Sequence, residues 1–150
     1  MDKPWEGGCV CGAVRYKITA KPQFGLVCHR TWCQRRSGSA FSFVAYCNEA
    51  DVQFNGAKRN TYEHRSDETG RWLRTEFCPV CGTGVTHTTE LRPGQRGIAA
   101  GTLDDPSSLE IVRHIWTRSS RSWVTVPEDV DVFEKGSAGA TPVRERSTRG

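Results

Sequence analysis

The sequence has no long hydrophobic run, and no segment is apolar over the length that a membrane-spanning helix needs. The opening stretch, Met1–Glu6, has neither the basic start nor the apolar core of a secretory signal peptide. We therefore expect a cytoplasmic protein with no membrane partner, in a compartment where thiols stay reduced. Basic residues are interspersed with acidic ones and form no compact run with interleaved aromatics, which argues against nucleic acid as a partner.

The sequence also lacks a long amphipathic helical pattern. Short runs rich in Val, Ile, Thr, Tyr and Phe are separated by Gly, Pro, Asn or Asp, which is typical of strands and turns. The expected strands cover residues 13–19, 40–46, 51–54, 60–64, 84–88, 97–100 and 111–116. Short helical turns are expected at Thr31–Ser37 and Asp105–Leu109. The sequence thus predicts a mainly β protein with antiparallel sheets, with one domain over residues 1–136 and a disordered tail at 137–150.

Seven cysteines are present, and four of them form two tight pairs, Cys9 with Cys11 and Cys78 with Cys81. Glycines flank each pair and Pro79 lies inside the second, so the backbone can turn and direct all four sulfurs at one metal ion. Four thiolates fill a tetrahedral coordination sphere, which predicts one structural zinc that clasps the sheets together. The alternative is a pair of disulfides or four free core thiols, although a disulfide between Cys9 and Cys11 would be strained.

Further motifs follow in a fixed order along the chain. They are Gly8–Gly12, Cys28–His29, Cys33–Phe41, Phe77–Thr83, Gly101–Pro106 and His114–Trp116 with Trp123. From about Trp5 to Phe133 this pattern resembles the glutathione-dependent formaldehyde-activating enzyme family, which includes centromere protein V. The resemblance implies a tent-like zinc β-fold and a structural zinc on the four paired cysteines. It also implies carbon–sulfur lyase chemistry at a second zinc, with a glutathione-linked thiol adduct as the partner.

The second site departs from the family pattern at one residue. The family holds its second zinc with a Cys-His-Cys-x-x-Cys run, whose counterpart here begins at Cys28 and ends at Cys33 with Arg30 in the middle ligand position. Arginine stays protonated and cannot ligate zinc, so two sulfurs remain, with a water, His29 or a substrate thiol to complete the site. We therefore expect one structural zinc and a weak, open second site. Cys47 is interpreted either as a buried strand cysteine or as a replacement ligand for the second zinc.

The altered segment has a possible chemistry without a metal. Arg30, Arg35 and Arg36 are close in sequence to Cys28 and Cys33, and cations beside a thiol favour the nucleophilic thiolate. Both cysteines are therefore candidate catalytic residues, with Cys28 acting on a sulfur-linked adduct or as an acid toward it. The arginines would bind the carboxylates of glutathione as bidentate pairs. The alternative is that the arginines lie on a solvated face and the cysteines have no role.

Three other side chains are candidate residues of the same site. Trp32 either forms the wall of a pocket for the group attached to sulfur or packs in the core. His114 is a candidate general acid or base, because histidine titrates near neutral pH, or else a packing residue. In a continuous strand His114 and Trp116 would point to one face, which makes Trp116 a candidate substrate contact.

Two classes of function follow from these residues. The first is a carbon–sulfur lyase that makes or breaks a bond in a glutathione or related thiol adduct, similar to S-(hydroxymethyl)glutathione synthase. The second is a non-catalytic, zinc-stabilised binding module, by analogy with the centromere relative. Binding of glutathione conjugates distinguishes them, because a ligand that binds only the folded state raises its stability.

Overall fold

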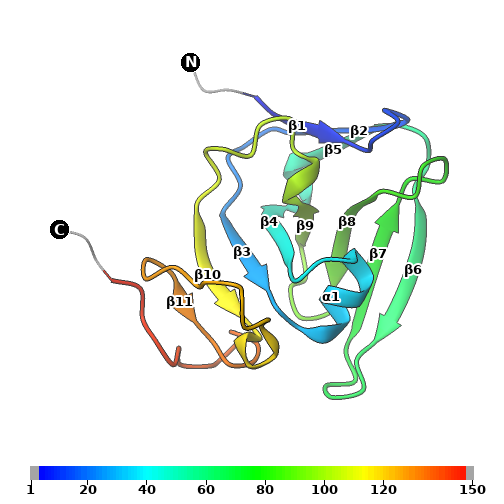
Figure 1. The fold of residues 1–150 in the computed structure, drawn as a ribbon. Coiled ribbons are helices and arrows are strands. Elements are labelled where there is room, and N and C mark those ends of the chain that lie inside the picture. The colour runs from blue at the N-terminus through cyan, green and yellow to red at the C-terminus, as the bar shows by residue number, and fades with distance from the viewer. Residues whose placement is uncertain (1–3, 148–150) are drawn as a thin grey trace. The chain divides into compact units, whose positions relative to one another are not determined.

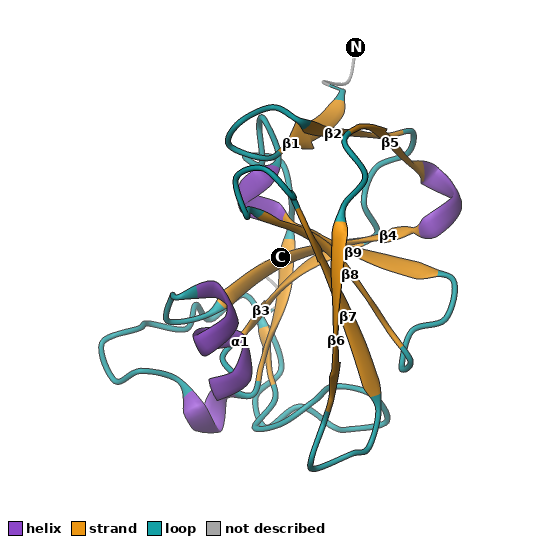
Figure 2. Cartoon of the chain, turned by 90° about the vertical axis from the view of Figure 1, so that its right-hand side faces the viewer, coloured by secondary structure: helices purple, strands orange, loops and turns teal. Residues whose placement is uncertain are grey.

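The computed structural model describes residues 4–147, and strands make up most of its regular structure (Figures 1 and 2). The strands are β1 (Trp5–Gly8), β2 (Val14–Ile18), β3 (Phe24–Cys28), β4 (Ser42–Asn48), β5 (Val52–Gly56), β6 (Asn60–Arg65), β7 (Trp72–Phe77), β8 (Gly84–Thr89), β9 (Gln95–Ala99), β10 (Ile111–Ile115) and β11 (Asp131–Val132). The helical elements are α1 (Thr31–Ser37) and the 3₁₀ turns η1 (Glu49–Asp51), η2 (Ala100–Thr102) and η3 (Thr117–Ser119). The prediction of a mainly β protein is confirmed.

The chain divides into two units that alternate along the sequence. Unit 1 contains residues 1–23 and 45–109, and unit 2 contains residues 24–44 and 110–150. Strand β4 contributes to both, since the boundary falls between Val44 and Ala45. Each unit is described by itself below.

Unit 1 contains a small antiparallel sheet in the order β1-β2-β5. Its middle strand alternates as the sequence predicts: Val14, Tyr16 and Ile18 are buried, and the residues between them are more exposed. The hydroxyls of Tyr16 and Thr102 lie 2.8 Å apart. Gly7 packs against this pair, and a Cβ there would come within 2.3 Å of the Tyr16 hydroxyl, so the position admits only glycine.

The rest of unit 1 is a run of strands in the order β4-β9-β8-β7-β6. The β6–β7, β7–β8 and β8–β9 pairs are antiparallel, as expected for strands joined by short turns. Val85 and Ile98 are fully buried in this sheet. The turn between β7 and β8 carries Cys78 and Cys81, so the hairpin positions the second cysteine pair.

Unit 2 contains β11, β10, β3 and the start of β4 in that order, together with α1. This part of the sheet is mixed, because β10 runs parallel to both β3 and β11, whereas the sequence predicts antiparallel pairing. A parallel pair needs a long crossover connection, and more than eighty residues separate β3 from β10. Cys28 ends β3 and Cys33 lies in α1, so the strand and the helix together position the altered segment.

Several predicted elements match the structure and several differ. Helix α1 has the predicted bounds, whereas Asp105–Leu109 forms a turn without a helix, held by a bond from the Leu109 amide to the Pro106 carbonyl. β10 ends at Ile115, and Trp116 takes a left-handed conformation (φ 58°). The prediction that His114 and Trp116 share one strand face is therefore wrong, because the strand has ended before Trp116.

The predicted boundary at residue 136 stays a prediction. In the described part of the segment that follows, Val143 and Arg144 form backbone hydrogen bonds with Val132, and the Arg146 amide donates to Asp131. Residues 148–150 of the predicted tail, and residues 1–3 of the stretch read for a signal peptide, lie outside the described residues.

Candidate functional site

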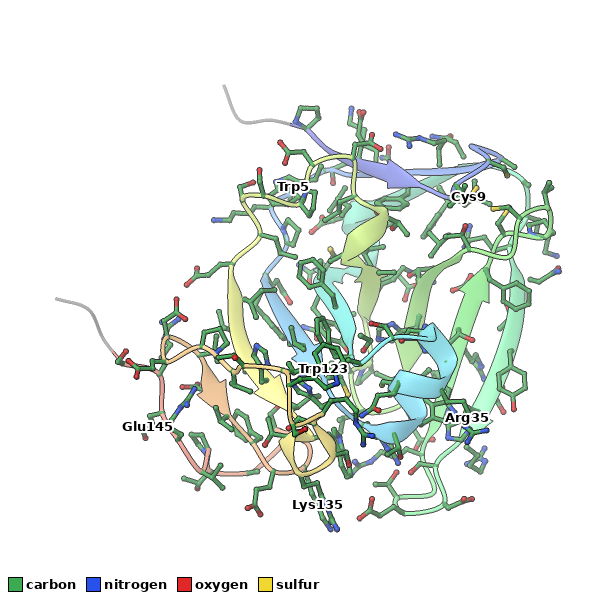
Figure 3. All side chains as sticks on the ribbon, viewed as in Figure 1. Trp5, Cys9, Arg35, Trp123, Lys135 and Glu145 are labelled. Atoms are coloured by element: carbon green, nitrogen blue, oxygen red, sulfur yellow. The ribbon has the colours of Figure 1, made fainter. Side chains whose placement is uncertain are left out.

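The four paired cysteines converge in unit 1, as the sequence predicts (Figure 3, near the label of Cys9). The Sγ atoms of Cys9, Cys11, Cys78 and Cys81 all lie within 4.8 Å of one another. The Cys9–Cys11 sulfurs are 3.6 Å apart and the Cys11–Cys78 sulfurs 3.7 Å apart. A tetrahedral zinc with Zn–S bonds of about 2.3 Å places its sulfurs about 3.8 Å apart, so these residues fit such an ion. The cluster could therefore hold a metal ion.

Backbone amides around the cluster point at the sulfurs. The Val14 amide donates to Cys9 Sγ at 3.2 Å, and the amides of Val80 and Cys81 donate to Cys78 Sγ at 3.3 and 3.5 Å. Such N–H donors stabilise thiolate charge and orient metal ligands. The Thr83 hydroxyl lies 3.1 Å from Cys81 Sγ and accepts a hydrogen bond from the Val10 amide at 3.3 Å, which ties the two cysteine segments together.

The remaining paired cysteines, Cys28 and Cys33, lie in unit 2 with their sulfurs 3.3 Å apart. Both are buried, with 6% and 8% of their surface exposed. Among the described residues, they belong to no group of three or more metal-ligating side chains. The segment therefore presents two thiols in contact, with Arg30 between them in sequence.

The pKa values of the two thiols are shifted in opposite directions. The hydrogen bond between them, with smaller contributions from Ser42 and from the charges of Arg36 and Arg30, lowers the pKa of Cys33 to about 7 against the effect of burial. The same hydrogen bond and burial raise the pKa of Cys28 well above its ordinary value. A pair of titratable groups with pKa values driven apart can divide the roles of base and acid. Cys33 is therefore the more acidic thiol of the pair and Cys28 the less acidic one.

His114, predicted as a general acid or base, forms a buried pair with His29. Nε2 of His29 and Nδ1 of His114 lie 2.8 Å apart, and the rings are stacked with centroids 5.1 Å apart. Burial, with the nearby charges of His29 and Arg144, lowers the pKa of His114 to about 4, and burial also lowers the pKa of His29. Both imidazoles are therefore neutral near pH 7. Nδ1 of His29 is buried and has no hydrogen-bond partner in the described structure.

Arginines and tryptophans of unit 2 stack in pairs. The Arg30 guanidinium lies 4.7 Å from the ring centre of Trp116, and the Arg36 guanidinium lies 5.5 Å from that of Trp32. Arg36 is exposed on α1, and the two tryptophans are half-buried. Each tryptophan, whether at a pocket wall or in the core, thus packs against a cation. Arg35, the remaining predicted substrate contact, is also exposed on α1 (Figure 3).

Cys47 lies in unit 1, outside the four-cysteine cluster. It is buried with 2% of its surface exposed, and burial raises its pKa to about 12. These properties agree with a buried strand cysteine in β4 and not with a thiolate ligand.

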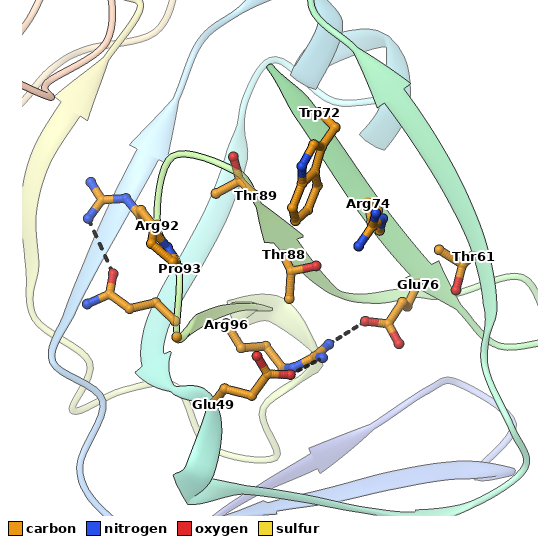
Figure 4. A pocket seen from close by; sticks show the side chains of 12 residues that line it. Glu49, Thr61, Trp72, Arg74, Glu76, Thr88, Thr89, Arg92, Pro93 and Arg96 are labelled. Carbon is orange, nitrogen blue, oxygen red and sulfur yellow. Dashed lines mark hydrogen bonds and ion pairs between the residues drawn. The ribbon is translucent and has the colours of Figure 1, made fainter.

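Unit 1 also contains a pocket that sequence reasoning missed. Its volume is about 370 Å³, and it opens on the face of β7 that carries Trp72, Arg74 and Glu76 (Figure 4). Buried Arg96 projects into it and forms ion pairs with Glu49 and Glu76. The partners are twenty or more residues apart, so no local motif marks the site. Three arginines and two glutamates line it, and we assign it no role.

The described residues contain no helix that is long and apolar enough to cross a membrane.

Comparison with known proteins finds a matching family and a solved structure of similar fold. Residues 4–119 match the family described as glutathione-dependent formaldehyde-activating enzyme, which is more than half of the 150 residues. A crystal structure of a Rhodobacter sphaeroides protein is similar in fold, with a TM-score of 0.52 and 22% sequence identity over 66% of this chain and 87% of that one. The family match includes both cysteine segments described above and confirms the resemblance seen in the motifs. The chain belongs to the glutathione-dependent formaldehyde-activating enzyme family.

Proposed function

We propose that this protein is a carbon–sulfur lyase that makes or breaks the bond between a glutathione or related thiol and a small carbon group. The family membership supports glutathione-dependent formaldehyde activation in general terms. The observation that carries the finer proposal is the contact of Cys28 with Cys33 in a segment where a third thiol is replaced by Arg30. Reduced thiols and glutathione are both features of the cytoplasm, which we propose as the location.

The two thiols divide the reaction between them. In the cleavage direction, the Cys33 thiolate takes the hydroxyl proton of a hydroxymethyl thioether, and the electrons of the O–H bond form the carbonyl. The carbon–sulfur bond breaks, its electron pair leaves with the substrate sulfur, and the Cys28 thiol supplies a proton to that sulfur. The products are an aldehyde and a free thiol, and synthesis is the reverse. At neutral pH the lowered pKa of Cys33 makes a thiolate available, and the raised pKa of Cys28 keeps that thiol protonated.

Arginines of the same segment would bind the substrate. Glutathione has two carboxylates, and Arg35 and Arg36 are exposed on α1, where they can form bidentate pairs with them. Arg30 lies over Trp116 and Arg36 over Trp32, so each cation has an aromatic neighbour that limits its freedom. Ordering the arginines before binding reduces the entropy that the complex must lose.

His114 acts in this proposal as a neutral group. With a pKa of about 4 it is not an imidazolium at neutral pH, and its Nδ1 is already engaged by His29. We therefore assign it a positioning role beside Cys28, since His29 follows that cysteine directly in the chain.

We propose that one zinc ion binds the four-cysteine cluster of unit 1 and has a structural role. A closed set of four thiolates leaves no position for substrate. A second zinc is not part of the proposal, because Cys28 and Cys33 alone are a weak ligand set and Arg30 brings a positive charge. Elemental analysis of purified protein should give about one zinc per chain. A value near two would restore a zinc-dependent mechanism, and a folded protein with none would refute the structural zinc.

The lyase proposal is tested by following formaldehyde and glutathione by NMR with purified protein. We expect faster exchange between free formaldehyde and the hydroxymethyl adduct than in protein-free buffer. Cys33→Ser should abolish the acceleration, and Cys47→Ser, a matched change at a buried cysteine outside the pair, should retain it. S-alkyl glutathione should raise the melting temperature of the wild type. No acceleration and no thermal shift would leave the binding-module alternative as the better description.

A further inference from the structure

The Cys28–Cys33 contact has a second consequence, independent of any lyase activity. The sulfurs lie 3.3 Å apart, which is closer than the sulfurs of the four-cysteine cluster at 3.6 and 3.7 Å. A disulfide bond is about 2.05 Å long, so the two sulfurs need to approach by only about 1.3 Å. The two sulfurs are in direct contact, closer than the spacing of about 3.8 Å between the ligands of a tetrahedral zinc.

The backbone between the two cysteines is fixed by hydrogen bonds. The side-chain amide of Gln34 donates to the His29 carbonyl at 2.7 Å and to the Ser119 carbonyl at 2.9 Å. The His29 amide donates to the Ile115 carbonyl at 3.0 Å. These bonds hold the end of β3 and the first turn of α1 together, so the two thiols remain neighbours. Such fixed proximity raises the effective concentration of one thiol toward the other.

We propose that Cys28 and Cys33 form a reversible disulfide when the protein meets hydrogen peroxide or another small hydroperoxide. In the first step, the Cys33 sulfur attacks one peroxide oxygen, the O–O bond breaks, and a sulfenic acid and hydroxide form. In the second, the Cys28 sulfur attacks the Cys33 sulfur and displaces the sulfenic oxygen as water. Two thiols and one peroxide thus give one disulfide and two waters. Two molecules of a thiol such as glutathione reverse the change and become a disulfide themselves.

The surroundings favour Cys33 as the attacking residue. Arg30 and Arg36 place positive charge near its sulfur and stabilise the thiolate, which is the reactive form. Cys28 keeps its proton until the sulfenic acid forms beside it, and no access from solvent is needed for that second step. Both residues are buried, so a small hydroperoxide reaches them more readily than a bulky disulfide does.

The other thiols of the chain differ in ways that the test can use. The four-cysteine cluster is in unit 1, and a bound metal would hold its thiolates. Cys47 is buried with a pKa of about 12, so it carries almost no thiolate and reacts slowly. Peroxide should therefore consume Cys28 and Cys33 before any other cysteine.

The experiment treats zinc-loaded full-length protein with a stoichiometric amount of hydrogen peroxide. Intact mass, peptide mapping and zinc release to a chromophoric chelator are measured together. We expect the mass to fall by two hydrogens, a peptide cross-link between Cys28 and Cys33, and no zinc release at that point. Dithiothreitol should restore the starting mass. In Cys28→Ser the expected product is an oxygen adduct on Cys33, and Cys47→Ser should behave like the wild type.

Three outcomes would overturn the proposal. Oxygen adducts on the wild type without a cross-link would show that the sulfurs do not reach bonding distance. Zinc release before any loss of Cys28 would show that the four-cysteine cluster is the reactive site. A second zinc bound to Cys28 and Cys33, with both protected from peroxide, would show a metal site instead. Because the readouts are mass and zinc, an absent lyase activity leaves the result unaffected.

Discussion

The two cysteine groups place the same side chain in different surroundings. In unit 1 four thiols surround one point, and backbone amides of Val14, Val80 and Cys81 donate to their sulfurs. In unit 2 two thiols touch each other, and the cations near Cys33 belong to arginine side chains. Backbone donors and a full ligand set favour a fixed metal. A thiol pair near arginine charge favours proton transfer and oxidation.

We propose that a single residue, Arg30, accounts for much of this difference. A thiol in place of Arg30 would give unit 2 three sulfurs in one short segment, enough for an open metal site. With arginine there, the positive charge that a metal would supply comes from the protein itself. On this proposal the number of thiols, more than their spacing, separates a metal site from a reactive thiol pair.

The largest expected effect comes from breaking the cluster in unit 1. Cys78→Ser leaves three thiolates and should cost several kcal/mol of unfolding free energy, because metal binding in such sites contributes directly to folding. Chemical denaturation with parallel zinc analysis measures it. Cys47→Ser, also at a buried cysteine of unit 1, removes no cluster ligand and should be mild by comparison. A zinc-free Cys78→Ser protein that unfolds like the wild type would refute the structural role.

The next prediction concerns a variant that adds a third thiol to the cysteine pair of unit 2. Arg30→Cys restores a third thiol, so zinc content should rise from about one to about two per chain. Bound zinc would hold Cys28 and Cys33 and so protect both from peroxide. Elemental analysis and thiol counting check these two points together. A folded variant that keeps one zinc would show that Arg30 does not occupy the ligand position, and the comparison of the two groups would then lose its basis.

The sequence allowed much of the fold to be predicted, for identifiable reasons. Strands such as β2 and β8 were predicted because their residues favour strands and clear turn residues bound them. β3 was missed because it is buried almost throughout and does not alternate, and β7 because charged residues interrupt its pattern. The parallel pairing of β10 was missed because pairing between distant strands has no local signature.

The candidate site shows the same limit. The cysteine pairs could be recognised because ligand spacing is local in sequence. The partners of His114 and Trp116 could not, since His29 and Arg30 lie about 85 residues earlier in the chain. The division of roles between Cys28 and Cys33 also needed the structure, because it depends first on the hydrogen bond between the two thiols.

A smaller effect is expected from replacing the exposed arginines of α1. Arg35→Gln or Arg36→Gln should weaken binding of an S-alkyl glutathione by about 1 to 2 kcal/mol, since a charged hydrogen bond is lost at an exposed position. Folding should hardly change. Isothermal titration calorimetry measures the difference, and Arg71→Gln, an exposed arginine of unit 1, is the control. Equal affinities in all three variants would place the carboxylates elsewhere.

The smallest effect concerns pH and the buried histidine pair. The pKa of His114 is about 4 in the folded protein, below its ordinary value of 6.5, because of burial and of the charges of His29 and Arg144. As pH falls through 6.5, the unfolded chain binds a proton that the folded chain does not. The contribution to stability is therefore complete above pH 6.5 and decreases from there toward pH 4. Between pH 7.5 and 5.5 this group alone should lower the unfolding free energy by about 1 kcal/mol.

Replacing the histidine isolates this contribution. His114→Gln should be less stable than the wild type at pH 7.5, but its stability should fall less on acidification. The measurement is chemical denaturation at both pH values, with zinc content followed so that loss of metal from unit 1 is not mistaken for titration in unit 2. His64→Gln, on β6 of unit 1, should keep the full pH dependence of the wild type. If His114→Gln also kept the full pH dependence, His114 would not be the buried, neutral imidazole that the structure of unit 2 indicates.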